Sequence, residues 1–295
     1  MATKARVALF KTVGAVMEAL PERADVAVAR AIASTMGRRN KGARDNLSRN
    51  LAHALSPNGS SANDELLELF VNRGFRSYGQ YWAEGAKLPA LAKSVIYDRF
   101  TIAEGLEHLR EGKERGKGVV IALPHVGSWE WGGSFLNSLG LGMTAIAEEL
   151  DPPELFAWFK EKRESIGIRI EPLNEHAGSV LLSTLRAGAI VGLLCDRDLQ
   201  GNGVEVEFFG ERVTMPAGPA TLALRTGATL VAAGCYAGPG RDHFAVITPP
   251  IEVERTKKLR DDVSRVTQSI AVELEGLIRR APEQWHVLED RFVTS

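Results

Sequence analysis

The chain has 295 residues, of which 44% are hydrophobic and 25% charged, with a formal net charge of −1, as in an ordinary globular protein with one large α/β domain or two smaller ones. Its longest apolar runs are too short to cross a bilayer, and Lys11 and Glu18 interrupt the stretch that a signal peptide would keep apolar. Cys195 and Cys235 lie inside apolar runs, so we expect a cytoplasmic protein with reduced, buried cysteines.

The first 49 residues are basic and amphipathic. They hold ten Lys or Arg and four Asp or Glu, a net charge of +6 that leaves −7 for the rest of the chain. Apolar residues recur there at the spacing of one helix face: Val7, Phe10, Val13, Met17 and Leu20. The pattern fits a helix packed on its own protein or a helix lying on an anionic membrane. Nucleic acid is a poorer partner, because the interleaved aromatic residues of single-strand binders are missing.

A polar break, SPNGSSAND (56–64), follows this arm, and Asp64 is the expected N-cap of the next helix. We therefore expect two regions. Residues 1–55 form a basic helical region, the candidate for membrane association, and residues 56–295 form an α/β domain.

From about residue 103, helices of 12–15 residues alternate with short apolar strands, which predicts a mostly parallel sheet covered by helices on both faces. Strands are expected at 118–123, 143–149, 167–173, 189–195, 204–209, 228–236 and 243–248. Helices are expected at 103–115, 128–139, 152–166, 175–187, 216–227 and 256–280. Asp151 is the expected N-cap before 152–166, and GNG (201–203) the expected hairpin turn.

Polar residues follow three of these strands. They are His125, then Glu148 and Glu149, then Asp196, Arg197 and Asp198. Ligands of open α/β sheets bind outside the carboxyl ends of the strands, so in a parallel sheet these residues would share one edge and one cleft. Each residue alone is equally explained by a solvated loop.

His125 and Glu130 belong to LPHVGSWEWGG (123–133), where a strand gives way to a helix. On one ideal helix they would lie about 140° apart. We therefore place His125 on the turn, Ser128 at the N-cap and Glu130 in the first helical turn, with its carboxylate bent back to the imidazole. Such a carboxylate fixes the tautomer and leaves the other nitrogen free as a general base, while Gly127 lets a substrate approach. The alternative is a structural histidine that caps the turn.

Motifs of other enzyme classes are missing or out of context. The sequence has no G-x-S-x-G elbow, H-E-x-x-H, Walker A or C-x-x-C, so no metal is assigned. GLGMTA (140–145) follows a helix and precedes a strand, the reverse of a dinucleotide-binding loop.

Four ordered blocks of the sequence resemble the bacterial lipid A-type (lauroyl/myristoyl) acyltransferase family. PHVGSWEWGG (124–133) is similar to its H-x4-D/E block, with Glu in place of Asp. The other three are FKEKRESIGI (159–168), the long stretch 187–228 and PEQWHVLEDRF (282–292). The basic arm and HVGSWEW are most similar to the actinobacterial branch that acylates phosphatidylinositol mannosides.

The resemblance implies a glycerolipid acyltransferase-like α/β fold and a specific reaction. A long acyl chain, such as palmitoyl, would pass from acyl-CoA, a co-substrate, to a mannose hydroxyl of a phosphatidyl-myo-inositol mannoside, with no cofactor. The related lipid A enzymes have an N-terminal transmembrane anchor. Here the basic amphipathic helices would instead give peripheral contact with the anionic cytoplasmic face of the plasma membrane. An acyl-CoA thioesterase with the same residues and a non-catalytic lipid-binding protein are the alternatives.

The resemblance also implies roles for individual residues. His125 would deprotonate the sugar hydroxyl, Glu130 would orient His125, and Arg163 would stabilise the site or bind a phosphate. The acidic candidates for binding sugar hydroxyls or fixing Arg163 are Glu148, Glu149, Asp196 and Asp198. One of Trp129 and Trp131 would pack in the core and the other line an acyl channel, a deep apolar pocket near His125.

Overall fold

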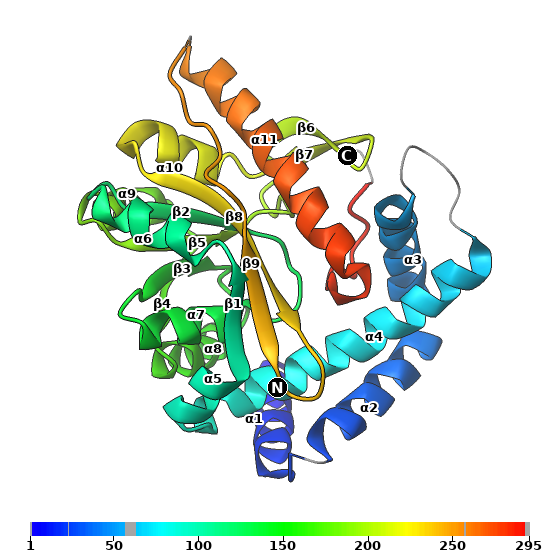
Figure 1. Cartoon of the computed structure of the whole chain (residues 1–295). Helices are drawn as coiled ribbons and strands as arrows, with labels where there is room; N and C mark the ends of the chain where they lie inside the picture. Colours follow the sequence, from blue (N-terminus) through cyan, green and yellow to red (C-terminus); the bar gives the residue numbers. More distant parts are fainter. Residues whose placement is uncertain (1, 23, 57–62, 257, 293–295) are drawn as a thin grey trace.

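The protein is described by a computed structural model covering residues 2–22, 24–56, 63–256 and 258–292. A seven-stranded sheet has helices on both faces, and four N-terminal helices form a further layer (Figure 1). The strands of the sheet are β1 (Phe100–Glu104), β2 (Val119–Leu123), β3 (Met143–Ala147), β4 (Arg169–Pro172), β5 (Ile190–Leu194), β8 (Thr229–Ala237) and β9 (His243–Ile247). A separate antiparallel pair consists of β6 (Val204–Phe208) and β7 (Glu211–Met215).

The strand order is β1-β9-β8-β2-β5-β3-β4, and every neighbouring pair is parallel except β8 and β9. This confirms the predicted mostly parallel α/β sheet. Val119 to Leu123 of β2 pair in register with Ile190 to Leu194 of β5, and Met143 of β3 also pairs with Ile190. The carboxyl ends of β2, β5 and β3 therefore lie side by side, so the polar residues that follow them share one edge of the sheet.

Two groups of helices cover the two faces of the sheet. The first group contributes to one apolar cluster and comprises α5 (Lys93–Arg99), α6 (Leu106–Glu114), α7 (Trp129–Ser138) and α8 (Pro153–Ser165). The second contributes to the other cluster and comprises α9 (Ala177–Arg186), α10 (Gly218–Thr226) and α11 (Leu259–Arg280).

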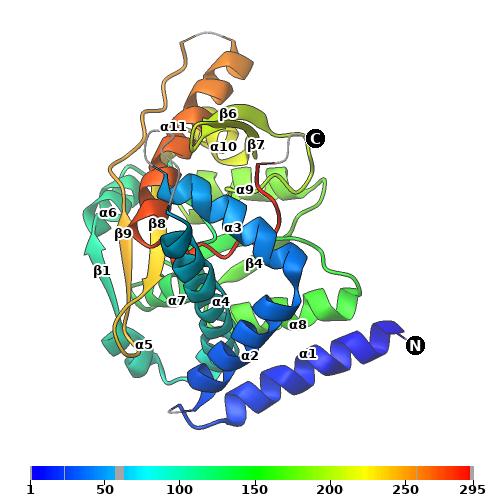
Figure 2. The ribbon, with the colours of Figure 1, turned by 90° about the vertical axis from the view of Figure 1, so that its right-hand side faces the viewer.

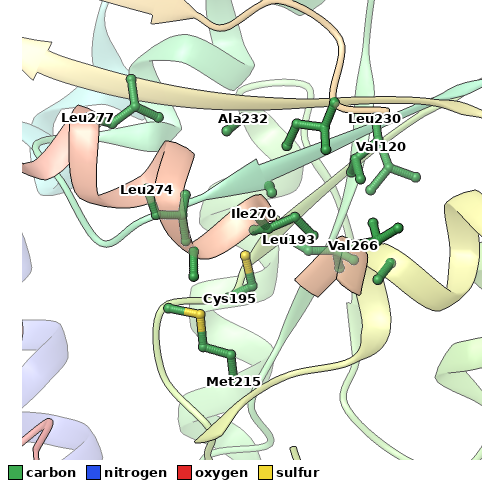
Figure 3. Packing of buried hydrophobic residues seen from close by; sticks show 14 of the residues in the cluster. Val120, Leu193, Cys195, Met215, Leu230, Ala232, Val266, Ile270, Leu274 and Leu277 are labelled. Atoms are coloured by element: carbon green, nitrogen blue, oxygen red, sulfur yellow. The ribbon is translucent and has the colours of Figure 1, made fainter. Parts of the chain in front are cut away.

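Side chains of β2 alternate between the two clusters. Val120 and Ala122 belong to the cluster beneath α11, whereas Val119, Ile121 and Leu123 belong to the opposite one. Figure 3 shows the α11 side, where the helix packs on β2, β5 and β8 through Val266, Ile270, Leu274 and Leu277. Because both faces of the sheet are buried at β2, the sequence of this strand is an unbroken apolar run.

The hairpin turn predicted at GNG (201–203) is wrong. The two-residue turn lies between β6 and β7, at Phe209 and Gly210, whose φ angles of 52° and 83° suit a tight antiparallel connection. Residues 201–203 form a loop held by Asp198, which accepts hydrogen bonds from the N–H groups of Gly201 (3.0 Å) and Gly203 (2.8 Å). Strands β1 and β7 were not predicted from the sequence.

Two predicted helix caps are also wrong. Asn63, not Asp64, caps α4 (Asp64–Lys87) by accepting hydrogen bonds from the N–H groups of Glu65 and Leu66. Asp64 is the first helical residue, where the positive end of the helix dipole stabilises its carboxylate. The N-cap of α8 is Pro152 rather than Asp151, and it makes no side-chain capping hydrogen bond.

The N-terminal layer consists of α4 and the three helices before it: α1 (Ala2–Ala19), α2 (Asp25–Arg39) and α3 (Lys41–Leu55). Figures 1 and 2 show α2 lying along α4. The contact is close, because a Cβ at Gly79 of α4 would come within 2.5 Å of the Ala29 carbonyl oxygen. Asn50 of α3 donates hydrogen bonds to the carbonyl oxygens of Val287 and Glu289. The first three helices thus pack on the remaining chain, and a domain boundary at residue 55 stays a prediction.

Part of the apolar stripe predicted near the N-terminus packs on the protein. Phe10 meets Phe159 of α8 edge to face, with ring centroids 6.2 Å apart, and Met17 is buried, whereas Val13 is 48% exposed. On α2, Val28, Ile32 and Met36 are exposed at four-residue spacing. None of the helices within the described residues is both long and apolar enough to cross a membrane.

Candidate active site

The turn between β2 and α7 places His125 at the carboxyl edge of the sheet. Gly127 has a φ of 56°, and a Cβ there would lie 1.9 Å from the Cys235 carbonyl oxygen, so the turn requires glycine for its own packing. The Gly127 N–H donates to the Gln284 carbonyl (2.9 Å), and the Ser128 N–H donates to that of Cys235 (3.1 Å). Ser128 occupies the predicted N-cap, but its buried hydroxyl makes no hydrogen bond to any residue that the structure describes.

The imidazole of His125 is bonded to Asp196, which follows β5. Its Nδ1 lies 2.5 Å from Asp196 Oδ1, and the His125 backbone N–H donates to Oδ2 at 3.0 Å. An ionised carboxylate only accepts hydrogen bonds, so in the neutral imidazole Nδ1 carries the proton and Nε2 has the lone pair. The His125 side chain is 25% exposed, whereas that of Asp196 is fully buried.

Asp196 is held in its charged form. Burial by itself would raise the pKa of this carboxyl. The charge of His125, two hydrogen bonds from that residue and one from the Trp285 indole outweigh burial and lower the pKa of Asp196 to about 2. The carboxylate therefore stays ionised at neutral pH, as a partner for an imidazolium must.

Glu130 lies in the first turn of α7, as predicted, but its carboxylate is not bonded to His125. Its Oε1 accepts hydrogen bonds from the hydroxyl of Tyr81 (α4) and the guanidinium of Arg163 (α8), each at 3.1 Å. Its Oε2 is buried without a hydrogen-bond partner within the described part of the chain. The contacts differ from those predicted: Asp196 is hydrogen-bonded to His125, and Glu130 is hydrogen-bonded to Arg163. The reason is that α7 directs Glu130 toward α4 and α8.

Arg163 is held by both charge and aromatic contacts. Its guanidinium carbon lies 5.0 Å from the ring centroid of Trp129 and 5.8 Å from that of Phe159. Burial opposes the charge of this group, but interactions with Glu130 and Tyr81 together outweigh burial and raise the pKa of Arg163. Burial and the charge of Glu130 also raise the pKa of Tyr81, which keeps its hydroxyl protonated as a donor.

A cavity of about 890 Å³ opens at this edge of the sheet. Five of the predicted site residues line it: His125, Trp129, Glu148, Arg163 and Asp198. Its other walls include aromatic side chains of α4 and α8 and aliphatic side chains of α9 and α10. No group of His, Cys, Asp or Glu in the described ranges is arranged to hold a metal ion.

The remaining predicted residues lie outside the cavity wall. Glu149 is exposed, and Asp196 and Glu130 are buried behind the residues that they hold. Trp131 packs in the core, stacked on His243 with ring centroids 4.1 Å apart. Trp129 is therefore the tryptophan of the pair that borders the cavity. It also borders a small apolar void of about 30 Å³ beneath α7.

Three further residues, for which the sequence predicts no role, contact the site residues. Tyr81 bonds to Glu130, Trp285 donates its indole N–H to Asp196 Oδ2 at 2.8 Å, and the His286 N–H donates to the His125 carbonyl at 2.8 Å. Trp285 and His286 belong to the block 282–292 that resembles the family, which was the one available signal. No local pattern shows that Trp285 reaches a residue 89 positions earlier.

The chain is similar over most of its length to known bacterial acyltransferases. The sequence profile described as bacterial lipid A biosynthesis acyltransferase matches residues 2–294. A phosphatidylinositol mannoside acyltransferase of Mycolicibacterium smegmatis is 32% identical over 255 residues, covering 85% of this chain and 80% of that protein. One of Mycobacterium tuberculosis is 34% identical over 256 residues, covering 85% and 78%. A lipid A biosynthesis acyltransferase of Haemophilus influenzae is 25% identical over 185 residues, covering 61% and 55%.

Proposed function

Because the chain belongs to the bacterial lipid A biosynthesis acyltransferase family, we propose a specific acyl transfer at its cavity. The donor is a long-chain acyl-CoA, with palmitoyl as the favoured chain, and the acceptor is a mannose hydroxyl of a phosphatidylinositol mannoside. The names of the mycobacterial relatives support the acceptor. The observation that carries the proposal is an imidazole whose Nδ1 is fixed by a buried carboxylate and whose side chain lines the cavity.

The chemistry follows from that imidazole. Nε2 of His125 takes the proton of the sugar hydroxyl while the hydroxyl oxygen attacks the thioester carbonyl carbon. When the tetrahedral intermediate collapses, the C–S bond breaks, and the imidazolium returns the proton to the departing CoA thiolate. The products are an ester and CoA, with no acyl-enzyme intermediate. General-base catalysis of this kind contributes about 10²- to 10⁴-fold, and positioning of the two substrates adds to it.

Arg163 supplies positive charge to the same cavity. It stabilises the negative charge that develops on the thioester oxygen or binds a phosphate of a substrate. Glu148 and Asp198 line the cavity as hydrogen-bond acceptors for sugar hydroxyls.

The direct test is an assay with palmitoyl-CoA and a mannosylated phosphatidylinositol that follows lipid product and free thiol. We expect His125→Ala to lower turnover at least about 10²-fold. The variant should still fold, with a lower thermal unfolding midpoint because the buried Asp196 carboxylate loses a hydrogen bond. His176→Ala is the matched control, because that histidine's side chain is 78% exposed.

Three outcomes would overturn the proposal. Near-wild-type turnover of His125→Ala would show that His125 is not the general base. Fatty acid released at equal rates with and without the acceptor indicates a thioesterase. Binding of acyl-CoA with no turnover on any acceptor indicates a lipid-binding protein.

The acyl chain is proposed to lie between α9 and α10. Leu181, Leu182 and Leu222 form apolar walls there. Burying a sixteen-carbon chain is worth about 0.8 kcal/mol per methylene, or roughly 12 kcal/mol before ordering costs. Gly178 of α9 also lines the cavity, and a Cβ at this position would meet no atom of the described residues within 4 Å. A larger side chain there would shorten the space without straining the backbone.

We therefore expect Gly178→Leu to shift the preferred donor to shorter acyl chains. For long-chain donors, kcat/KM should fall about fourfold for each methylene that the cavity no longer holds. Gly276→Leu on α11 is the control, since its Cβ also meets nothing within 4 Å and it lies outside the cavity. An unchanged chain-length profile of Gly178→Leu would place the acyl chain elsewhere.

The protein is proposed to act at the cytoplasmic face of the plasma membrane as a peripheral protein. Val28, Ile32 and Met36 present one exposed apolar face of α2. Exposed basic residues lie on the same layer: Lys11, Arg38, Arg39 and Lys41. An apolar helix face combined with positive charge suits an anionic lipid surface.

Sedimentation with vesicles of phosphatidylglycerol and phosphatidylcholine tests this surface. Ile32→Asp should weaken binding about tenfold, because it replaces an inserted apolar side chain by a charge that lipid headgroups repel. Val272→Asp changes an exposed valine on α11 (58%, against 49% for Ile32) and should leave binding unchanged. Equal effects of the two variants would contradict the assignment of α2.

A further inference from the structure

Two buried carboxylates flank the turn that carries His125, and they have different partners. Asp196 uses Oδ1 for the imidazole Nδ1 and Oδ2 for the His125 backbone N–H and the Trp285 indole. Glu130 uses Oε1 for Tyr81 and Arg163. The histidine and the glutamate of one H-x4-E motif therefore belong to two separate hydrogen-bond groups.

Trp285 is fixed independently of the carboxylate that it binds. Its side chain is 1% exposed and packs near the rings of Phe208 and Phe209, at centroid distances of 6.1 and 5.7 Å. The indole N–H has only its donor function, and Asp196 Oδ2 accepts it at 2.8 Å.

The segment around Trp285, residues 281–292, also holds the backbone on both sides of this contact. Its His286 N–H donates to the His125 carbonyl, and Arg291 Nε donates to the Asp196 carbonyl. The same segment thus fixes the backbone of His125, the backbone of Asp196 and the Asp196 carboxylate that binds the imidazole.

We propose that Asp196, held by the indole of Trp285, is the positioning residue of His125, and that Glu130 instead positions Arg163. The inference rests on the proposed role of His125 as general base. It assigns the orientation of that base to β5 and the C-terminal segment (residues 281–292), rather than to the second residue of the H-x4-E motif.

The chemical consequence concerns the tautomer of His125. A carboxylate at Nδ1 accepts a proton and offers none, so the neutral ring must carry its proton on Nδ1 and present a lone pair at Nε2. In Asp196→Asn an amide of the same shape can donate to Nδ1. The ring proton then moves to Nε2, where it blocks proton transfer from the sugar hydroxyl.

The first experiment reads that tautomer directly. Protein labelled with ¹⁵N-histidine is observed by NMR at alkaline pH, where imidazoles are neutral, and the His125 signals are assigned by their loss in His125→Ala. We expect protonated Nδ1 and unprotonated Nε2 in the wild type and in Glu130→Gln, and the reverse in Asp196→Asn. A wild-type ring protonated on Nε2, or a tautomer changed by Glu130→Gln and not by Asp196→Asn, would overturn the proposal.

The second experiment separates kcat from KM. Asp196→Asn should lower kcat about 10²-fold or more with little change in KM, because the variant keeps the cavity wall and loses the lone pair at Nε2 that accepts the proton. Trp285→Phe keeps most of the ring packing and removes one hydrogen bond to a charged group, so we expect kcat to fall about tenfold. Trp158→Phe, on α8, is the control. A wild-type kcat in Trp285→Phe would show that the Trp285 indole has no part in positioning Asp196 and His125.

These readouts distinguish the two proposals. If His125→Ala retains turnover, the proposed base fails whatever the tautomer is. If His125→Ala is inactive while Asp196→Asn keeps both the tautomer and kcat of the wild type, the base stands and the positioning role fails. Should Asp196→Asn not fold, the wild-type tautomer and the kcat of Trp285→Phe decide the matter.

Discussion

The candidate site is built from two regions with different construction. One is the sheet edge, where short turns after β2 and β5 carry His125 and Asp196 and are fixed by backbone hydrogen bonds. The other is the cover over that edge, where long side chains of α4, α8 and the C-terminal segment reach inward, among them Tyr81, Arg163 and Trp285. The backbone thus positions His125, the proposed base, while side chains of the cover hold Asp196 and place charge at the cavity.

The largest expected effect comes from disturbing the sheet edge itself. Gly127→Ala combines a φ of 56° with a Cβ that would lie 1.9 Å from the Cys235 carbonyl oxygen. We expect a loss of at least about 3 kcal/mol in the free energy of unfolding, together with loss of activity. Gly201→Ala has a similar φ of 66° but no atom within 4 Å of the new Cβ, so it should cost only about 1–2 kcal/mol. Equal costs in urea unfolding would show that the close approach to Cys235 is unimportant.

A smaller effect is expected from the C-terminal segment when the pH falls. Burial and the charge of His125 lower the pKa of His286 from 6.5 to about 3. Between these values the unfolded chain binds a proton that the folded protein does not. Stability therefore decreases as the pH drops from 6.5 toward 3, by up to about 1.4 kcal/mol per pH unit.

Urea unfolding at pH 6.5 and 4.5 checks this contribution. In His286→Gln the free energy of unfolding should depend less on pH than in the wild type. In His176→Gln, at an exposed position, its dependence on pH should be unchanged. Identical slopes for the wild type and His286→Gln would show that His286 accepts its proton in the folded state.

The smallest effect is expected where the cover meets Glu130. Tyr81→Phe removes one of the two donors to Glu130 Oε1 and leaves Arg163 as the other. We expect a loss of about 1 kcal/mol in the free energy of unfolding and a fall in kcat/KM of less than tenfold. Tyr97→Phe is the control, because this ring is 56% exposed on α5. A larger fall than that of Asp196→Asn would reverse the relative importance of the two regions.

The sheet edge could be predicted from the sequence, and the cover largely could not. Apolar runs that end in His125, Glu148 and Asp196 identify three strands, and parallel pairing then brings their ends together. The assignment of Glu130 to His125 failed because the carboxylate nearest in sequence is directed toward α4 and α8. The contact of Trp285 with Asp196 depends on the tertiary path of α11 and the segment that follows it. No local spacing encodes that path.

A structure of the protein with a non-hydrolysable thioether analogue of palmitoyl-CoA would show whether His125 lies at the reacting carbon. We expect the acyl chain to lie between α9 and α10. The carbon that replaces the thioester carbonyl should lie close to His125 Nε2, with room for one hydroxyl oxygen about 3–3.5 Å from that carbon. If the analogue binds with its sulfur remote from His125, or if other side chains shield the His125 ring from it, His125 is not the base.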